Sequence, residues 1–264
     1  MGWTDEIASF LCAEGFSFAM NDVSGIMDFR IGVPERNAVL NLDAVPVCSE
    51  TLTSAEKILE SASALRQEPG RRVFLAQDLW MGRREVAEKR ILAQLGRFRS
   101  VFARNTEVRR ITGPESGTFL SRWHTYGDAS ARYRYGLFSR DSGMVAVASF
   151  SSPRKWVKDN VVIKSYEWVR YASLPDVRVV GGMGKVLAAF MDEVGPDDIM
   201  SYADLEWTDG KTYETLGFVK ESFRAPLLFT VDPVTWKRSR AVAEAECGKW
   251  MHYNMGSVKY RLRI

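Results

Sequence analysis

Short apolar runs bounded by turn residues dominate the first hundred positions and predict a small α/β unit. Ser54 can cap a helix whose apolar positions recur at helical spacing up to the Pro69-Gly70 break. Gly96 follows a second stretch of helical spacing and is a typical helix end. The predicted order is strand 29–33, strand 38–42, helix 54–65, strand 72–76 and helix 83–95.

The pattern after Gly96 predicts a second and longer α/β region. Asp141-Ser142-Gly143 separates two apolar runs and indicates a β-hairpin. The expected elements are strand 100–111, helix 115–124, hairpin strands 133–139 and 144–149, strand 161–171, helix 185–194, strand 199–203, helix 211–216 and a last strand pair. We therefore expect two domains, 1–98 and 99–264.

Composition narrows the class of protein. The chain has 264 residues, of which 46% are hydrophobic and 26% charged, and this excludes a disordered or fibrous protein. Its apolar runs are shorter than the roughly 20 residues of a membrane helix, and its first residues lack a secretory pattern. Cys12, Cys48 and Cys247 fit neither a disulfide framework nor a zinc site. We expect a cytoplasmic protein with no membrane contact; the sequence identifies no metal-binding residues and leaves metal involvement and oligomeric state open.

The net charge of +3 hides a strong asymmetry along the chain. Residues 1–68 contain 11 acids and 4 bases, net −7, and the remaining 22 acids and 32 bases give +10. Arginines are densest from 71 to 110, where a nucleic-acid surface and a solvated helix face with interleaved Glu85 and Glu88 are both open interpretations. The candidate contacts to nucleic acid are Arg83, Arg84, Arg97, Arg99 and Arg104.

A glycine-rich turn precedes the predicted helix 185–194. Backbone N–H groups at such a strand-to-helix turn can bind phosphate, and tight packing is the alternative reason for the glycines. The candidate phosphate-binding residues are Val180, Gly181, Gly182, Gly184 and Lys185.

Together with the strand after it and the YETLGF string of Tyr213–Phe218, this turn resembles the GNAT acyltransferase superfamily. The resemblance implies a mixed-sheet α+β fold, acetyl-CoA or a related acyl-CoA as donor, and Tyr213 as the acid that protonates the departing thiolate. Packing is the alternative role of Tyr213. The chain departs from the usual pattern at Val179, where most members have Gln or Arg.

A narrower resemblance is to the GNAT-like domain of phage proteins related to the Mom DNA-modification enzyme. It is carried by Phe119-Leu120, Tyr166-Glu167-x-x-Arg170 and the string from Ser201 to Asp204. It implies functional roles for Asp204 and Tyr213. Glu167 is a candidate base and His124 a candidate substrate contact, with a turn or structural role as the alternative for Asp204 and His124. Strand alternation predicts that Glu167 and Arg170 face opposite ways.

The first domain resembles very-short-patch-repair and other PD-(D/E)xK endonucleases. Asp28 matches the first acid of that family, but Asn41 stands where its metal-binding Glu is expected. Magnesium-dependent hydrolysis needs several carboxylates. We therefore expect a degenerate endonuclease-like α/β domain, unless Asp43 takes over the missing ligand.

These observations lead to one hypothesis and two alternatives. The hypothesis is a phage-type GNAT-like transferase that acylates an amine on nucleic acid, most simply DNA, with Trp123, Tyr126, Trp156 and Trp168 as candidates for base stacking. The alternatives are a PD-(D/E)xK-type endonuclease and a non-catalytic DNA-binding protein.

Overall fold

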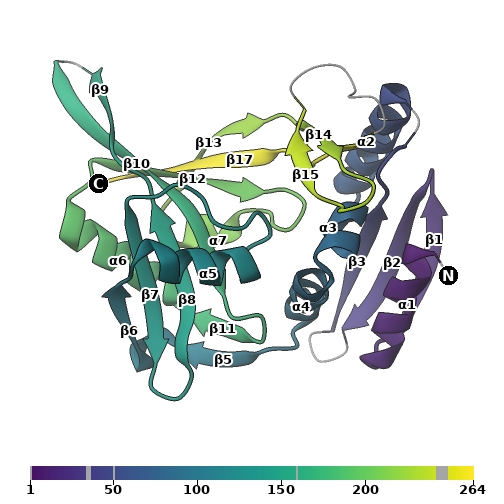
Figure 1. Ribbon diagram of the computed structural model, residues 1–264, viewed down its shortest axis with the longest axis horizontal. Coiled ribbons are helices and arrows are strands. Elements are labelled where there is room, and N and C mark those ends of the chain that lie inside the picture. The colour runs from purple at the N-terminus through teal and green to yellow at the C-terminus, as the bar shows by residue number, and fades with distance from the viewer. Residues whose placement is uncertain (1, 34–36, 50, 159, 242–248) are drawn as a thin grey trace. The chain divides into compact units, whose positions relative to one another are not determined.

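The computed structural model describes residues 2–33, 37–49, 51–158, 160–241 and 249–264, so Cys247 lies outside the described residues. Its contacts divide the chain into two compact units (Figure 1). Unit 1 comprises 1–96, 204–209 and 223–257, and unit 2 comprises 97–203, 210–222 and 258–264. The sequence suggests a single cut after residue 98, whereas the contacts group two later segments with the N-terminal part.

Unit 1 is built on a four-stranded sheet of order β1-β2-β3-β4. The first three strands are antiparallel, and β4 runs parallel to β3 after the crossover helix α2. The elements are α1 (Trp3–Ala13), β1 (Phe18–Val23), β2 (Ile26–Val33), β3 (Ala38–Val45), α2 (Leu52–Gln67), β4 (Arg71–Ala76), α3 (Gln77–Gly82) and α4 (Arg84–Leu95). The side chains of Phe29, Leu42 and Trp80 form the centre of its core.

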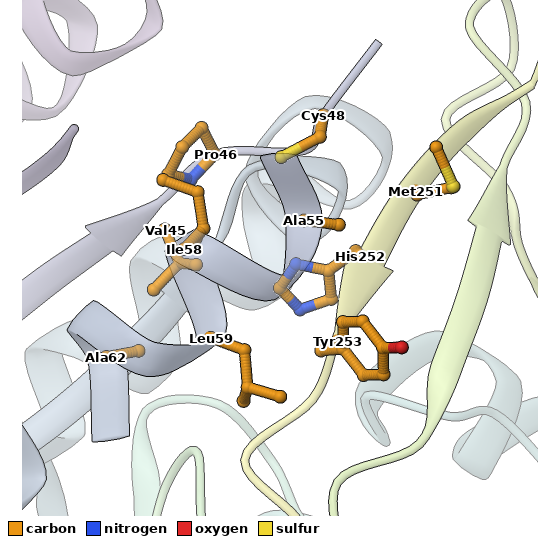
Figure 2. A pocket seen from close by; sticks show the side chains of 10 residues that line it. All are labelled: Val45, Pro46, Cys48, Ala55, Ile58, Leu59, Ala62, Met251, His252 and Tyr253. Carbon is orange, nitrogen blue, oxygen red and sulfur yellow. The ribbon is translucent and has the colours of Figure 1, made fainter. Parts of the chain in front are cut away.

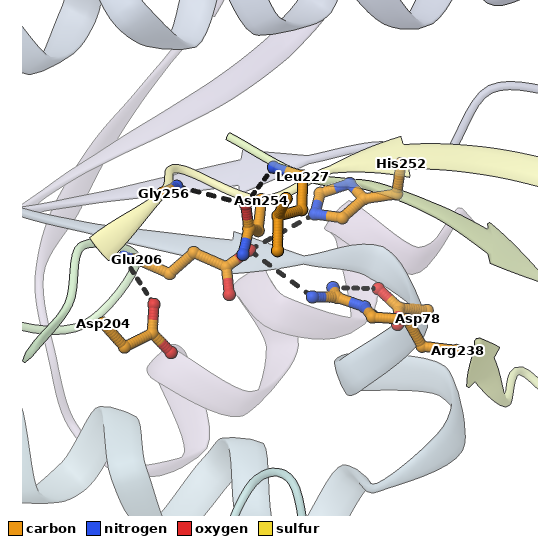
Figure 3. Close-up of polar contacts among 8 residues, drawn as sticks. All are labelled: Asp78, Asp204, Glu206, Leu227, Arg238, His252, Asn254 and Gly256. Atoms are coloured by element: carbon orange, nitrogen blue, oxygen red, sulfur yellow. Dashed lines mark hydrogen bonds and ion pairs between the residues drawn. The ribbon is translucent and has the colours of Figure 1, made fainter. Parts of the chain in front are cut away.

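A buried polar network ties the later segments into unit 1 (Figure 3). The Arg238 guanidinium donates two 2.7 Å hydrogen bonds to the Asp78 carboxylate, and Glu206 lies 3.7 Å from Arg238 and 3.3 Å from the His252 ring. Arg238 begins one strand, and His252 lies in another, of the three-stranded sheet β15 (Arg238–Arg240), β14 (Leu228–Val231) and β16 (Trp250–Tyr253). Paired in this way, the buried charges connect the sheet of β14, β15 and β16 to Asp78 of the N-terminal segment.

Unit 2 is built on an eight-stranded mixed sheet whose main path is β13-β17-β12-β10-β8-β7-β6, with β9 paired to β10. A separate parallel pair joins β5 and β11. The elements are β5 (Arg99–Phe102), the 3-10 turn η2 (Ala103–Asn105), β6 (Thr106–Arg110), α5 (Gly113–Trp123), β7 (Tyr133–Ser139), β8 (Gly143–Phe150), β9 (Arg154–Lys158), β10 (Val161–Ser173), β11 (Val177–Val180), α6 (Gly182–Val194), β12 (Asp198–Asp204), α7 (Lys211–Thr215), β13 (Val219–Arg224) and β17 (Ser257–Arg263).

The two faces of this sheet are covered by different helices. On one face Phe190 of α6 stacks on Phe150 at 4.0 Å between ring centroids, with Tyr133 and Tyr135 edge-on. On the other face Phe119 and Leu120 of α5 pack with Val147 and Ala172. Burial of these apolar side chains fixes the central strands and the loops that join them.

Several elements predicted from periodicity are found, and one is wrong. The helices near 54–65, 83–95 and 115–124 and the hairpin around Asp141 all form. The single strand expected over 100–111 is instead β5 and β6, separated by η2, because the Thr106 hydroxyl donates to the Ala103 carbonyl and closes a turn there. Among the described residues, no helix is long and apolar enough to cross a membrane.

Candidate functional site

Two parallel strands in the middle of the unit 2 sheet separate part-way along their length. β10 and β12 are in register only at three pairs, Ser165 with Asp198, Tyr166 with Ile199 and Glu167 with Met200. β10 continues to Ser173 and β12 to Asp204, so within the described part of the chain the ladder stops while both strands run on. Parallel strands that part at their carboxyl ends form a typical ligand-binding position.

The Ser201 side chain lies at the point where these strands separate. Its Oγ is 3.0 Å from the Trp168 carbonyl oxygen of β10 and 2.9 Å from the Tyr213 hydroxyl of α7. Ser201 has a single hydroxyl proton, so it donates to one of these two oxygens at a time. When it donates to the carbonyl, Tyr213 donates to Ser201. Ser201 is the first residue of the Ser-Tyr-Ala-Asp string, in which the sequence predicts a functional role only for Asp204.

The Tyr213 ring is held in an aromatic environment that controls its ionisation. It stacks on Tyr260 at 5.4 Å and meets the edges of Trp168 and Phe218. Gly210 allows this stacking, because a Cβ there would lie 2.4 Å from the Tyr260 hydroxyl. Burial raises the pKa of Tyr213, opposed by the hydrogen bond from Ser201. Tyr213 therefore holds its proton at neutral pH.

A β-bulge in β10 overturns the expectation that Glu167 and Arg170 face opposite ways. Trp168 is paired with Phe150 and Arg170 with Ser149, so Val169 is an additional residue on β10. Register partners share a face, and alternation then places Glu167 and Arg170 together on the face opposite Trp168. The pKa of Arg170 is consistent with this placement. Burial lowers that pKa, and the negative charge of Glu167 opposes the lowering.

His124 caps the C-terminal end of α5. Its Nδ1 accepts a 3.1 Å hydrogen bond from the Tyr126 N–H, and its carbonyl accepts from the Gly127 N–H. The Gly127 carbonyl accepts in turn from Arg170, which ties the His124 turn to the face of β10 that carries Glu167. His124 therefore lies in a turn attached to that face, with Nδ1 used as an acceptor.

The glycine turn begins α6 and is close to α7. Gly181 is the N-cap with a φ of 76°, and a Cβ on Gly182 would lie 2.7 Å from Val179 and 2.8 Å from the Tyr171 hydroxyl. A Cβ on Gly184 would meet Leu216, just after α7, at 3.3 Å. Among the described residues no side chain caps α6, and its first turn carries no acid, so its first N–H groups suit an anion.

Lys185 and Val180, both expected to bind phosphate, make other contacts in the structure. The Lys185 ammonium donates to the Ala103 carbonyl at 2.9 Å and to the Thr106 carbonyl, while its backbone N–H donates to Gly181. Lys185 is thus directed to the η2 turn. Val180 is exposed and pairs with Phe102 across the β11–β5 ladder.

Asp204 ends β12 and is grouped with unit 1. Its carboxylate accepts a 3.0 Å hydrogen bond from the Glu206 N–H (Figure 3), and its carbonyl accepts from the Trp207 and Thr208 N–H groups. The charge of Asp204 also opposes the burial that lowers the pKa of Arg66. These contacts give Asp204 a role in the turn that follows β12.

The candidate arginines fall in both units. Arg84 of unit 1 forms ion pairs with Glu6 and with Glu88 and lies 4.0 Å from the Trp80 ring centroid, and burial lowers the pKa of Arg83. In unit 2, Arg97 is exposed. Arg99 donates to the Ser142 hydroxyl, and the Arg104 guanidinium lies over Phe102.

The carboxylates of the expected endonuclease-like site surround an arginine. Asp28 and Asp43 are register partners on β2 and β3, whereas Asn41 is opposite Arg30. Arg72 lies 2.7 Å from Asp43 and 3.7 Å from Asp28, and it also pairs with Glu68. Burial raises the pKa of Asp43 to about 7 despite Arg72. Among the described residues, no three His, Cys, Asp or Glu side chains are placed to hold a metal ion.

Unit 1 also contains a small, mostly apolar pocket (Figure 2). It lies between α2 and β16, and the Cys48 and Met251 backbones bridge one side of it with two 2.8 Å hydrogen bonds. His252 lines it together with Tyr253, and the His252 ring is hydrogen-bonded to Glu206. The pocket belongs to the structural network of unit 1.

Comparison with solved structures finds acetyltransferases. Spermidine/spermine N-acetyltransferase SpeG from Vibrio cholerae is 12% identical over 61% of this chain and 94% of its own, with a TM-score of 0.36. Ribosomal-protein-S18-alanine N-acetyltransferase from Escherichia coli is 15% identical over 60% and 94%, with a TM-score of 0.36. Ribosomal-protein-S5-alanine acetyltransferase from Vibrio fischeri is 10% identical over 60% and 93%, with a TM-score of 0.40.

No protein-family model and no curated protein matches the chain. Because the three TM-scores are below 0.5, the function has to be inferred from the site itself.

Proposed function

We propose that the chain is a GNAT-like acyltransferase that transfers an acyl group from acetyl-CoA or a related acyl-CoA to an amine on nucleic acid. The observation that carries this proposal is the strand separation in unit 2. Tyr213 packs against the Trp168 side of β10, and Glu167 lies on the opposite face of the same strand. An acid and a base on opposite faces of the sheet, beside the separated strands, would suit a transfer between two molecules that approach from different faces.

The start of α6 fits the diphosphate of the donor. The helix is 13 residues long, and Gly182 and Gly184 place no side chain at two positions of its first turn. Gly182 and Met183 would hold the anion through their N–H groups. Lys185 contributes little charge there because its ammonium is bound to backbone carbonyls.

The reaction assigns one proton transfer to each of two side chains. The bound donor supplies its acyl group as a thioester. As the new C–N bond forms and the C–S bond breaks, Glu167 would accept the proton that the amine loses, and Tyr213 would give its proton to the departing sulfur. Ser201 would stabilise the resulting phenolate by turning its own proton toward Tyr213.

The nucleic-acid acceptor is supported by the net charge of +10 beyond residue 68. A base stacked in a duplex is inaccessible to this opening, so the acceptor amine would be on a flipped or single-stranded base. For unit 1 we propose a non-catalytic role, because Arg72 already neutralises the carboxylates that a nuclease would use for magnesium.

Mass spectrometry of nucleosides tests the proposed function. DNA from cells that express the wild-type chain should contain a nucleoside heavier by one acyl group, and Tyr213→Phe or Glu167→Gln should remove it. An unchanged nucleoside profile with the folded wild-type protein would contradict transfer to DNA.

A further inference from the structure

A two-stranded ribbon projects from unit 2 at the start of β10, the strand that also carries Glu167. We call β9 with the first part of β10, residues 154–158 and 161–165, the arm; Figure 1 shows it extending away from the rest of the sheet. Its register pairs Val157 with Val162 and Trp156 with Ile163. We propose that the arm binds double-stranded DNA in a groove and holds it for the transfer, an inference that rests on the proposed function.

The side chains of the arm do not form a core of their own. Trp156, Val157, Val161 and Val162 are 43%, 66%, 58% and 52% exposed. An isolated hairpin with its apolar residues in water is at best marginally stable. The exposure of these side chains therefore indicates that the arm binds a partner.

The charge of the arm selects an anionic partner. Residues 154–164 contain Arg154, Lys155, Lys158 and Lys164 against one acid, Asp159. Lys155 and Lys164 are directly opposite each other in the register, and like charges so placed destabilise a ribbon. A polyanion would relieve this repulsion.

The arm is firmly attached at its base. The Lys164 N–H donates a 2.6 Å hydrogen bond to the Asp197 carboxylate, and the Ser165 hydroxyl donates to Asp198, which also pairs with Arg261 at 2.8 Å. Two residues further along β10 is Glu167. A duplex held by the arm is therefore connected through one continuous strand to the candidate base.

The dimensions favour DNA over the other polyanions. Five paired residues span about 16 Å, and the major groove of B-form DNA, about 12 Å wide, admits a two-stranded β-ribbon. The major groove of double-stranded RNA is too deep and narrow for side chains to read. Trp156 and the valines would contact thymine methyl groups or an unstacked base, while Lys155 and Lys164 contact phosphates.

Binding is tested with the full chain and three probes: a 20-base-pair DNA duplex, the matching double-stranded RNA, and phosphatidylserine/phosphatidylcholine vesicles. Lys155→Gln/Lys164→Gln removes two expected phosphate contacts and should weaken duplex DNA binding about tenfold or more at low salt. It should also reduce the slope of the logarithm of the binding constant against the logarithm of the salt concentration by about 1.8. Trp156→Ala should weaken binding with the slope unchanged. The control Arg140→Gln/Lys220→Gln removes two exposed cations of unit 2 outside the arm.

Equal losses in the arm and control variants would overturn the proposal, as would vesicle or RNA binding that is tighter than DNA binding. Unchanged circular dichroism and thermal unfolding show that the arm variants are folded. If the arm variant loses DNA binding and the wild-type chain transfers no acyl group, the arm proposal stands and the proposed function fails.

Discussion

The two units place ionisable side chains in contrasting environments. In unit 1, Arg72 lies among Asp28, Asp43 and Glu68, so the charges compensate one another inside the fold. In unit 2, Tyr213 and Ser201 meet where two strands separate, and Glu167 remains partly exposed on the other face. Carboxylates gathered around an internal cation indicate structure, whereas an acid and a base beside an opening indicate chemistry.

The largest expected effect is on the chemistry of unit 2. Tyr213→Phe retains the ring that stacks on Tyr260 and removes the hydroxyl, so release of free CoA thiol from acetyl-CoA in the presence of DNA should fall by about 10²–10⁴-fold. Tyr260→Phe is the matched control. It removes a hydroxyl that donates to Glu214, and it should keep most of the activity. Equal rates for wild type and Tyr213→Phe would remove Tyr213 from the reaction.

Arg72→Ala tests the structural interpretation of unit 1. The change leaves the buried Asp43 carboxylate without its cation, so the free energy of unfolding should fall by about 3–5 kcal/mol in urea titration. Arg71→Ala, at the exposed neighbouring position, should cost less than about 1 kcal/mol. A stable Arg72→Ala protein that binds magnesium would instead support a latent metal site.

Gly182→Ala should weaken donor binding. The added Cβ would clash with Val179 and Tyr171 and distort the start of α6, so the Kd for acetyl-CoA in calorimetry should rise about tenfold or more. Gly113→Ala is the control, because a Cβ there meets nothing within 4 Å. The same Kd for both variants would place the donor elsewhere.

The last prediction concerns the pH dependence of unit 1. Asp43 has a pKa of about 7 in the folded chain and about 3.9 when unfolded, so between these values the folded state binds the additional proton. Its contribution to stability is full below about pH 4 and is lost as the pH rises to 7, at up to about 1.4 kcal/mol per pH unit. Asp43→Asn should flatten urea-measured stability over this range; an unchanged slope would contradict the raised pKa.

Local pattern predicted the regular elements but not the features that depend on distant contacts. The spacing of apolar residues located α2, α4 and the β7–β8 hairpin because those signals are local. The bulge at Val169 that turns Arg170 onto the face of Glu167 has no such signal, since it depends on how β10 pairs with β8. The return of residues 223–257 to unit 1 depends on Arg238 and Asp78, which are 160 residues apart.

Some residues of the candidate site could be predicted from the sequence, and others could not. Tyr213 and the glycines stand out as a string, and in the structure Gly184 lies beside Leu216, close in sequence to Tyr213. Ser201 begins a string that resembles a family motif, but its contacts with Trp168 of β10 and Tyr213 of α7 depend on how distant parts of the chain pack. The roles of Asp204, His124 and the arginines as substrate contacts stay predictions.

The central claim is that the chemistry belongs to unit 2 and not to unit 1, and one experiment measures both. Plasmid DNA, magnesium and acetyl-CoA are incubated with the wild-type chain, Tyr213→Phe or Asp28→Ala, and thiol release and strand cleavage are followed in the same sample. The account predicts thiol release without cleavage, lost in Tyr213→Phe and retained in Asp28→Ala. Cleavage that Asp28→Ala abolishes, with no thiol release, would contradict it.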